Sequence, residues 1–473
     1  MGVKCVKVII SNEITITEAT QEILDWCKRE LVLPNPEYAK KERMGLWVGN
    51  TPRTLSLYKI NGNSVIIPIG AFKMIKPILN TYNIEYEQKI ANNEHIDYNA
   101  EVSLYDYQKK AVEQMLKAGY GILQSPAGSG KTQMGIALAV KLGKKCLWLT
   151  HTQDLLKQSY DRASKYIDKS LLGTITAGKV NIGSGITFAT VQTLAKQDLT
   201  QYKYMFDVII VDECHRVAGT PTARTQFSAV LSNIACKHKY GLSATVHRAD
   251  GMIKCAYMLI GDVKYIVPDE AVKDKVMAVN IERVDTNCEI PFSALDTDGT
   301  INYTKLITSL ANSTKRNDII YDKLMKNSAH YNLILSDRLD QLHYLYSQLP
   351  PTLKEQSAVI DGKMTSKKAK AEREQAIEDM RTGKKHFLFA SYKLAKEGLD
   401  IPRLDRLHLV TPQKDYAIIV QSVGRIARTF EGKEQPICFD YVDKFKMAEN
   451  MYKARCRHYK KCGCNVKGVG VGK

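Results

Sequence analysis

Two successive series of short apolar segments, separated by helical stretches, constrain the fold of this 473-residue chain most strongly. The first series lies at 121–123, 146–149, 186–189, 208–211 and 240–242, and the second at 332–335, 357–360, 387–390, 406–410 and 436–439. Strands that are apolar along their whole length and alternate with helices indicate a parallel sheet covered on both faces. The sequence therefore predicts two tandem α/β domains.

A different pattern precedes the first series. Strand-like segments at 6–10, 13–16, 55–60 and 64–67 surround one helical segment at 17–31, with Thr17 as a candidate N-cap. This mixture predicts a small α+β domain. The predicted division is an N-terminal α+β domain at 1–95, a first α/β domain at 96–275, a connector or insertion at 276–305, a second α/β domain at 306–445 and a basic tail at 446–473.

The segment 125–132, with the sequence SPAGSGKT, follows an apolar strand and precedes a predicted helix at 133–141. Gly128, Ser129 and Gly130 allow backbone N–H groups to approach phosphates, and a helix N-terminus favours negative charge. Lys131 can reach the β- and γ-phosphates of ATP, and the Thr132 hydroxyl can hold Mg²⁺. The P-loop pattern has Gly where Ser125 stands here, but its Gly-Lys-Thr end is intact. We therefore predict an ATP and Mg²⁺ site rather than an ordinary glycine-rich turn.

The apolar strand at 208–211 is followed by Asp212, Glu213, Cys214 and His215. The carboxyl ends of parallel strands form the edge at which ligands bind in α/β sheets, so both carboxylates are expected there. Asp212 is placed to hold Mg²⁺, and Glu213 is placed to orient and deprotonate an attacking water. With the P-loop, this pair predicts an ATP-hydrolysing enzyme.

The Asp-Glu-Cys-His segment at 212–215 resembles the motif of superfamily 2 DEAD/DEAH-like helicases, and the other motifs of that set follow in order. This resemblance implies two RecA-like domains. The segment at 104–108 is similar to the adenine-contacting motif, with Gln108 at its glutamine position and Tyr105 where many relatives have Arg. The segment at 243–245 resembles the one that couples hydrolysis to domain movement, which implies that role for Ser243 and Thr245 together with His215.

The resemblance also implies nucleic-acid contacts and functional groups in the second domain. Backbone contacts are expected from Thr150, His151, Thr190, Thr193 and Ser391. The second coupling motif, at 397–400, places Gly398 and Asp400 near the nucleotide. In the segment at 421–428, Gln421 is expected to sense the nucleotide, and Arg425 and Arg428 are expected to act as arginine fingers.

The segment at 241–251 resembles the XPB/UvsW-like branch, which contains repair and transcription helicases and phage recombination helicases. Segments at 35–38, 45–49, 51–54 and 57–58 are similar to the small N-terminal domain of its phage members, and Arg53 is a candidate DNA contact. The resemblance implies a DNA helicase or translocase that reverses forks and migrates Holliday junctions in recombination, repair or replication. It also implies 3′-to-5′ movement. For Arg53 and Trp47, a surface turn and a core aromatic are the alternatives.

The net charge of +18 favours a polyanionic partner, although a basic surface without a ligand is an alternative. The segment at 444–473 has nine Lys and Arg residues but one acid, Glu449, so it is either a backbone-contacting strip or a solvated end. Phosphate contacts do not distinguish DNA from RNA. An RNA helicase therefore stays an alternative, as does a non-catalytic protein that holds branched DNA and uses ATP as a conformational ligand.

Several other classes of protein are disfavoured. No apolar run approaches the roughly 18 residues of a membrane span, and Lys7 interrupts any signal-peptide pattern. An odd, scattered set of eleven cysteines favours a reducing compartment. We expect a monomer in the cytoplasm, the host cytoplasm if the chain is phage-encoded, with DNA forks or junctions and no membrane as partner. Zinc ligands are conceivable at Cys456, His458, Cys462 and Cys464, although their spacing is tighter than usual.

Overall fold

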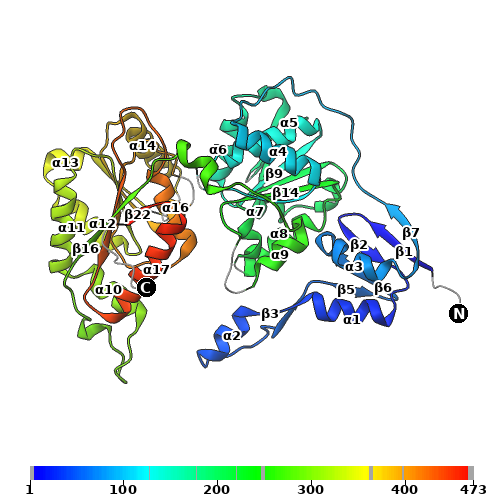
Figure 1. The fold of residues 1–473 in the computed structure, drawn as a ribbon, viewed down its shortest axis with the longest axis horizontal. Coiled ribbons are helices and arrows are strands. Elements are labelled where there is room, and N and C mark those ends of the chain that lie inside the picture. The colour runs from blue at the N-terminus through cyan, green and yellow to red at the C-terminus, as the bar shows by residue number, and fades with distance from the viewer. Residues whose placement is uncertain are drawn as a thin grey trace. The chain divides into compact units, whose positions relative to one another are not determined.

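The computed structural model describes residues 5–126, 128–176, 178–219, 221–246, 251–361, 366–396 and 399–466. Two compact units make up the chain (Figure 1). The first contains Met1–Pro126 and Gly130–Val267, and the second contains Ala127–Ser129 and Pro268–Lys473. The N-terminal part and the first α/β domain therefore share a unit. The main division falls after Val267, a few residues before the predicted boundary at 275.

The N-terminal part forms a five-stranded sheet in the order β5-β6-β2-β1-β7. Its elements are β1 (Cys5–Ile10), β2 (Glu13–Ile16), α1 (Gln21–Glu30), β3 (Val32–Pro34), α2 (Pro36–Arg43), β4 (Thr54–Ser56), β5 (Lys59–Asn61), β6 (Ser64–Pro68), the 3-10 turn η1 (Ile69–Ala71), α3 (Phe72–Leu79) and β7 (Asn83–Gln88). Helix α1 begins later than predicted, because Thr20 rather than Thr17 occupies its N-cap. The strand predicted at 55–60 is divided between β4 and β5.

Residues 32–56 form an arm that is separate from this sheet. Strand β3 pairs with β4 in antiparallel register, and α2 lies between them in the sequence. Pro36 begins α2, where the side chain of Asn35 accepts a hydrogen bond from the Glu37 N–H at 3.1 Å. Helix α2 has no buried residue. Figure 1 shows α2 and β3 extending away from the five-stranded sheet of the same unit.

The first α/β domain has an eight-stranded sheet in the order β11-β10-β12-β9-β13-β14-β8-β15. The five strands from β12 to β8 are mutually parallel and largely buried, as their continuous apolar sequences predict. The elements are α4 (Asp106–Ala118), β8 (Gly121–Gln124), α5 (Lys131–Leu142), β9 (Cys146–Thr150), α6 (Gln153–Ala163), η2 (Lys169–Leu171), β10 (Leu172–Thr176), β11 (Lys179–Asn181), β12 (Ile186–Thr190), α7 (Val191–Leu194), η3 (Leu199–Tyr202), β13 (Val208–Asp212), η4 (Cys214–Ala218), α8 (Pro221–Leu231), β14 (His238–Ser243), α9 (Ile253–Ile260) and β15 (Val263–Ile266).

The second unit has a seven-stranded parallel sheet in the order β18-β19-β17-β20-β21-β16-β22. Its elements are η5 (Asp269–Lys275), β16 (Asn280–Asp285), η6 (Phe292–Ala294), α10 (Tyr303–Ala311), α11 (Thr314–Lys326), β17 (Asn332–Ser336), α12 (Leu339–Gln348), α13 (Pro351–Glu355), β18 (Ser357–Ile360), α14 (Lys367–Thr382), β19 (Phe387–Ser391), α15 (Tyr392–Lys396), β20 (Arg406–Leu409), α16 (Tyr416–Ile426), β21 (Ile437–Val442), α17 (Lys446–Lys461) and β22 (Asn465–Val466). The predicted α/β class with two parallel sheets is confirmed.

Parts of the predicted connector and tail belong to the second α/β domain. Strand β16 lies within the range predicted as a connector, and Ile281 and Val284 of this strand are buried. Helix α17 lies within the range predicted as a tail, and its buried face consists of Ala448, Met451, Tyr452, Arg455, Cys456 and Tyr459. Residues 467–473 lie outside the described residues. Among the described helices, none is long and apolar enough to cross a membrane.

Candidate ATP and nucleic-acid site

Five adjacent parallel strands bring the predicted motifs to one edge of the first sheet. Along the order β12-β9-β13-β14-β8, the carboxyl ends carry Thr190, Thr150, Asp212, Ser243 and Ser125, respectively. The Ser125 N–H donates a hydrogen bond to the Ser243 carbonyl oxygen at 2.9 Å, which joins the P-loop to the 243–245 segment. Ligands of open α/β sheets bind at this edge. The sheet order therefore assembles motifs that are up to 118 residues apart in the sequence.

The P-loop leads directly into helix α5. Gly128 and Gly130 have φ values of +83° and +79°, and Gly130 is the N-cap of the helix. A side chain at Gly130 would also collide with the Gln108 amide. Helix α5 begins at Lys131, two residues earlier than predicted, so Lys131 and Thr132 lie in its first turn. Backbone N–H groups of a first helical turn have no intrahelical partner and favour an anion such as a phosphate.

The predicted adenine-contacting segment begins helix α4. Gln108 is buried, and its Oε1 accepts a hydrogen bond from the Tyr105 N–H at 2.9 Å. The rings of Tyr105 and Tyr107 stack with centroids 6.0 Å apart and an interplanar angle of 13°. Half of Tyr105 is exposed. The residue that replaces the usual Arg therefore presents an aromatic face on which a planar base can stack.

The two acids after β13 have different environments. Asp212 is 4% exposed, and burial raises the pKa of its carboxyl to about 7; the Glu213 charge adds to this shift and Lys131 opposes it. The Glu213 N–H donates to Asp212 Oδ1 at 3.0 Å. Glu213 has a φ of +48°, which turns the chain sharply at the strand end. A buried carboxylate beside a second acid fits a Mg²⁺ ligand, because Mg²⁺ prefers oxygen donors and favours the ionised form.

His215 lies between Glu213 and a hydrogen-bond relay that runs through Ser243 to Thr245. His215 Nδ1 lies 3.2 Å from Glu213 Oε2 and 3.1 Å from Ser243 Oγ. The Ser243 hydroxyl donates to the Thr245 carbonyl oxygen at 2.7 Å and accepts from the Thr245 N–H at 3.2 Å. Because the only Ser243 proton is used in this way, the His215–Ser243 hydrogen bond requires the proton to be on Nδ1. The relay therefore begins beside the predicted base and ends in the segment expected to transmit hydrolysis.

Burial divides the predicted nucleic-acid contacts of the first domain. Thr150 is fully buried, and its hydroxyl donates to the Thr152 carbonyl oxygen at 3.1 Å. Thr190 is 3% exposed and shares a 2.8 Å hydrogen bond with the Thr193 hydroxyl. The Thr150 and Thr190 side chains are therefore inaccessible to a nucleic-acid strand. This burial contradicts the expectation that they contact nucleic acid directly. His151 and Thr193 are partly exposed.

Two predicted motifs of the second unit meet through arginine contacts. Arg425, on α16, donates from Nη1 to the Leu399 carbonyl oxygen at 2.9 Å, and Arg428 forms an ion pair with Asp400. Gln421 is 8% exposed, and its Oε1 has no hydrogen-bond partner within the described part of the chain. Ser391 is the last residue of β19 and is partly exposed. Gly398 lies outside the described residues.

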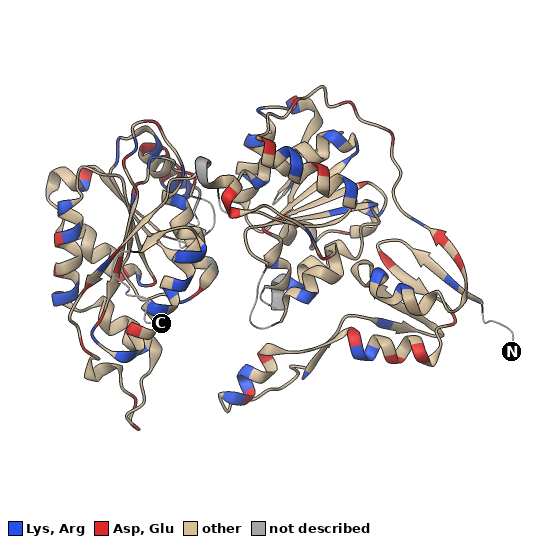
Figure 2. Cartoon of the chain, in the orientation of Figure 1, with Lys and Arg blue, Asp and Glu red and all other residues tan. Residues whose placement is uncertain are grey.

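The arm carries an exposed aromatic side chain among basic residues. Trp47 is 86% exposed, so its interpretation as a core aromatic is wrong. Met44 and Leu46, beside it, are 60% and 53% exposed, respectively. Exposed basic residues of the arm are Lys40, Arg43 and Arg53, and Figure 2 shows basic residues along α2. The interleaving of basic and apolar residues at 40–53 was the available sequence signal for this surface.

A cavity of about 770 Å³ lies between the arm and the first α/β domain. Its lining includes Trp47, Pro52 and Leu55 from the arm and Val217, Arg224, Cys255 and Met258 from the first domain. Val217 belongs to η4, which begins immediately after Glu213. The arm and η4, the turn that follows Glu213, therefore border the same cavity.

The cysteine-rich segment near the end of α17 does not gather its candidate zinc ligands into a cluster in the described part of the chain. Cys456 and Cys464 are buried against apolar side chains. No group of three or more His, Cys, Asp or Glu residues that could hold a metal ion occurs among the described residues.

Comparisons with known proteins identify the family. The family model named Type III restriction enzyme, res subunit, matches residues 101–248, and the model named helicase conserved C-terminal domain matches residues 315–430. The chain belongs to the superfamily 2 helicases. These matches contain the P-loop, the 212–215 motif and both predicted arginine fingers.

Relatives and a solved structure extend this result. The chain is 29% identical to mimivirus L396, provisionally named an ATP-dependent RNA helicase, over 86% of this chain and 74% of L396. It is 30% identical to the DNA 3'-5' translocase XPB2 of Sulfurisphaera tokodaii over 37% of this chain and 38% of XPB2, in agreement with the branch indicated by the 241–251 segment. S. cerevisiae Dbp5 bound to RNA and ADP BeF3 shares the fold, with a TM-score of 0.57, 16% identity and coverage of 77% of this chain and 90% of Dbp5.

The raised pKa of Asp212 gives a prediction for stability. Its folded-state pKa of about 7 exceeds the ordinary value of 3.8, so the stability of the nucleotide-free protein should fall as pH rises from about 4 to about 7. Asp212→Asn removes the buried charge. We expect it to raise the Tm, without nucleotide or Mg²⁺, more at pH 8 than at pH 5 in thermal unfolding. An equal effect at both pH values, or a lower Tm at pH 8, would contradict this prediction.

Proposed function

We propose that this chain is an ATP-dependent DNA helicase or translocase that remodels forks and four-way junctions in recombination, repair or replication. The observation that carries this proposal is the arm, where Lys40, Arg43 and Arg53 are exposed and the 86% exposed Trp47 borders the same cavity as η4. The XPB2 relative, named a DNA translocase, supports DNA as the substrate. The L396 relative, named an RNA helicase, supports RNA as the alternative.

At the proposed ATP site, the first domain binds the triphosphate and prepares the attacking water. The first turn of α5 and the Lys131 ammonium bind the β- and γ-phosphates. Thr132 and Asp212 are the residues that would hold Mg²⁺, which neutralises phosphate charge when bound. Glu213 orients the water and accepts its proton. Gln108 and the stacked Tyr105 hold the adenine.

The second domain supplies the remaining positive charge. Arg425 and Arg428 stabilise the charge that develops on the transferred phosphate, and Gln421 senses the nucleotide. Asp400 holds the Arg428 guanidinium until a phosphate group competes for it. Domain closure then depends on ATP, and hydrolysis permits opening. The relay from His215 through Ser243 to Thr245 transmits this change to the sheet edge.

The nucleic-acid strand is proposed to contact the exposed groups at both sheet edges. His151, Thr193 and Ser391 contact its phosphates, which provide grip without sequence selection. The arm meets the branch point, where Trp47 stacks on a base and Arg53 contacts a phosphate. Alternating grips by the two domains turn ATP hydrolysis into movement along one strand.

Trp47→Ala tests the branched-substrate assignment. Base stacking on an aromatic side chain contributes about 1–3 kcal/mol, so fork remodelling should fall about tenfold. ATP hydrolysis stimulated by single-stranded DNA should stay within about twofold of wild type, because its site lies in the RecA-like domains. Ile60→Ala is the matched control, since Ile60 is 58% exposed on β5, outside the arm. Equal rates for wild type and Trp47→Ala on forks would exclude the arm from substrate binding.

A further inference from the structure

The segment at 410–415 connects β20 to α16, the helix that carries Gln421 and Arg425. Four successive carbonyl oxygens accept hydrogen bonds from side chains of four different helices: Val410 from Arg316, Thr411 from Tyr392 at 2.9 Å, Pro412 from Tyr303 at 3.3 Å, and Gln413 from Arg455 at 2.9 Å. Asp415 then caps α16 by accepting from the Ile418 N–H at 3.0 Å. The start of the arginine-finger helix is thus fixed by side chains from outside it.

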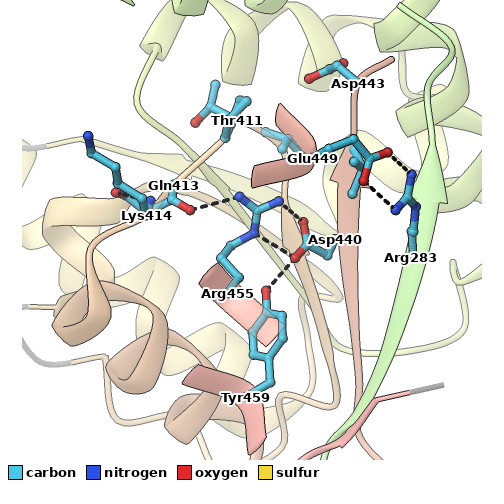
Figure 3. Close-up of polar contacts among 12 residues, drawn as sticks. Arg283, Thr411, Gln413, Lys414, Asp440, Asp443, Glu449, Arg455 and Tyr459 are labelled. Atoms are coloured by element: carbon cyan, nitrogen blue, oxygen red, sulfur yellow. Dashed lines mark hydrogen bonds and ion pairs between the residues drawn. The ribbon is translucent and has the colours of Figure 1, made fainter. Parts of the chain in front are cut away.

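Arg455 makes the most extensive of these contacts (Figure 3). Its Nε and Nη2 donate to the two carboxylate oxygens of Asp440, on β21, at 2.8 and 2.7 Å. Its Nη1 donates to Gln413, and the Tyr459 hydroxyl donates to Asp440 Oδ2 at 2.7 Å. The Arg455 and Asp440 side chains are 2% and 1% exposed, respectively. One buried guanidinium therefore bridges β21 and the segment that begins α16.

A second carboxylate at the end of β21 repeats this arrangement. Asp443 accepts from Arg316 Nε at 2.8 Å and from the Thr286 hydroxyl at 2.6 Å, and Arg316 also donates to the Val410 carbonyl oxygen. Both charged side chains are fully buried. The segment before α16 is therefore held at Val410 and at Gln413 by two different arginines, each of which is fixed by an aspartate.

Helix α17 contacts the first turn of α16 directly as well. The rings of Tyr416 and His458 meet edge to face with centroids 4.9 Å apart. The Lys461 ammonium lies 5.9 Å from the centroid of the Tyr416 ring. The contacts from α17 thus continue from the preceding segment into the helix itself.

Stability alone does not account for a buried arginine–aspartate pair. Desolvation of two charges offsets most of their attraction, and apolar residues of similar volume often stabilise a protein equally well. An arginine differs from an apolar residue, and from lysine, in offering a planar fork of donors whose directions are fixed. The geometry at Arg455 uses three of these donors on two different segments, which specifies position and orientation.

We propose that Arg455 is a positioning residue for the arginine fingers, which it aligns by bridging Asp440 to the Gln413 carbonyl oxygen at the start of α16. The proposal rests on the proposed role of Arg425 in ATP hydrolysis. It also assigns part of the predicted basic tail to the catalytic cycle. The high positive charge of this segment suggests DNA binding, but the face of α17 that carries Arg455 is buried. In this proposal, Arg455 affects ATP hydrolysis rather than DNA binding.

The decisive variant is Arg455→Lys in the full chain. Lysine keeps the positive charge beside Asp440, so the variant should fold, but a single ammonium cannot reproduce the fork across both segments. We expect kcat for DNA-stimulated ATP hydrolysis to fall at least tenfold, with KM for ATP and the Kd for single-stranded DNA within about threefold of wild type. Arg455→Met should give a loss at least as large.

Lys326→Met is the matched control, because it removes one positive charge from an exposed end of α11 in the same unit. Its kcat should equal that of wild type. The Tm of each variant, measured with the same samples, gives the folded fraction. Wild-type kcat in a folded Arg455→Lys protein would overturn the proposal. Unfolding of both Arg455 variants would also overturn it, since Arg455 would then be needed for folding.

A double-mutant cycle separates positioning from general damage. If Arg455 acts through Arg425, the double variant Arg455→Lys/Arg425→Ala should be no slower than Arg425→Ala alone. Multiplicative losses would contradict the proposal. Full activity of Arg425→Ala would overturn the finger assignment itself, whereas an inactive Arg425→Ala beside an active Arg455→Lys would overturn only the positioning role.

Discussion

Replacing Glu213 by glutamine is expected to lower kcat for ATP hydrolysis by about 10²–10⁴-fold. Glutamine keeps the size and the hydrogen-bonding capacity of the side chain but cannot accept the proton of the attacking water. Lys131 and the first turn of α5 are unchanged, so the Kd for ATP should stay within about threefold of wild type. Fork remodelling should stop. The measurement is steady-state hydrolysis together with equilibrium ATP and DNA binding by the same preparation.

The position of Glu213 makes this test specific. Its neighbour Asp212 is the buried acid with the raised pKa, and Glu213 is held 3.2 Å from His215 at the start of the relay. Glu355→Gln, at the exposed end of α13, is a charge control outside both the ATP site and the arm. A Glu213→Gln protein that hydrolyses ATP at more than a tenth of the wild-type rate would exclude Glu213 as the base. A variant that still remodels forks would favour the non-catalytic DNA-binding alternative.

Replacing Arg425 by alanine is expected to lower kcat by about 10³-fold or more, the range found for arginine fingers. The guanidinium stabilises charge that develops only in the transition state, so KM for ATP should change little. Arg425 also donates to the Leu399 carbonyl oxygen, and that contact is lost too. Arg425→Lys should recover only a small part of the rate, because an ammonium does not reproduce the fixed donor directions of a guanidinium.

Arg428 provides an internal comparison for this prediction. Arg428 forms an ion pair with Asp400. Asp400→Asn should therefore free the Arg428 guanidinium from this pair while both arginines stay in place. Single-turnover hydrolysis measures the chemical step without product release. A single-turnover rate for Arg425→Ala within tenfold of wild type would contradict the finger role. A raised KM with an unchanged rate would show that Arg425 binds ATP in the ground state only.

The positions of the ATP-site residues were predictable because they depend on local patterns. The apolar segment at 208–211 is long enough to identify β13, and a parallel strand ends at the ligand-binding edge. The same argument places Lys131 after β8. Strand order was not predictable from periodicity, since β14 lies between β13 and β8 although it follows both in the sequence. The Ser125–Ser243 contact depends on that order.

Burial of polar residues was the main feature that the sequence did not predict. Arg455 lies in a segment with nine basic residues, which suggests a strip that contacts the nucleic-acid backbone or a solvated end, but its partner Asp440 lies on a strand of the sheet. Thr150 was expected to contact nucleic acid, but its side chain is fully buried and donates to the Thr152 carbonyl oxygen. For Trp47 the sequence left a core aromatic and a DNA contact as alternatives, and its exposure of 86% excludes the first. Each case depends on tertiary neighbours that no local pattern contains.

The most direct test of the central claim is ATP hydrolysis and product formation in Mg²⁺ on a matched set of substrates. The set contains single-stranded DNA, a DNA fork, a four-way DNA junction and structured RNA, each with wild type and with Glu213→Gln. We predict that the wild type hydrolyses ATP and remodels the fork and the junction faster than the other substrates, and that Glu213→Gln remodels neither. Stimulation and unwinding by RNA alone would contradict the account and assign the same motor to RNA.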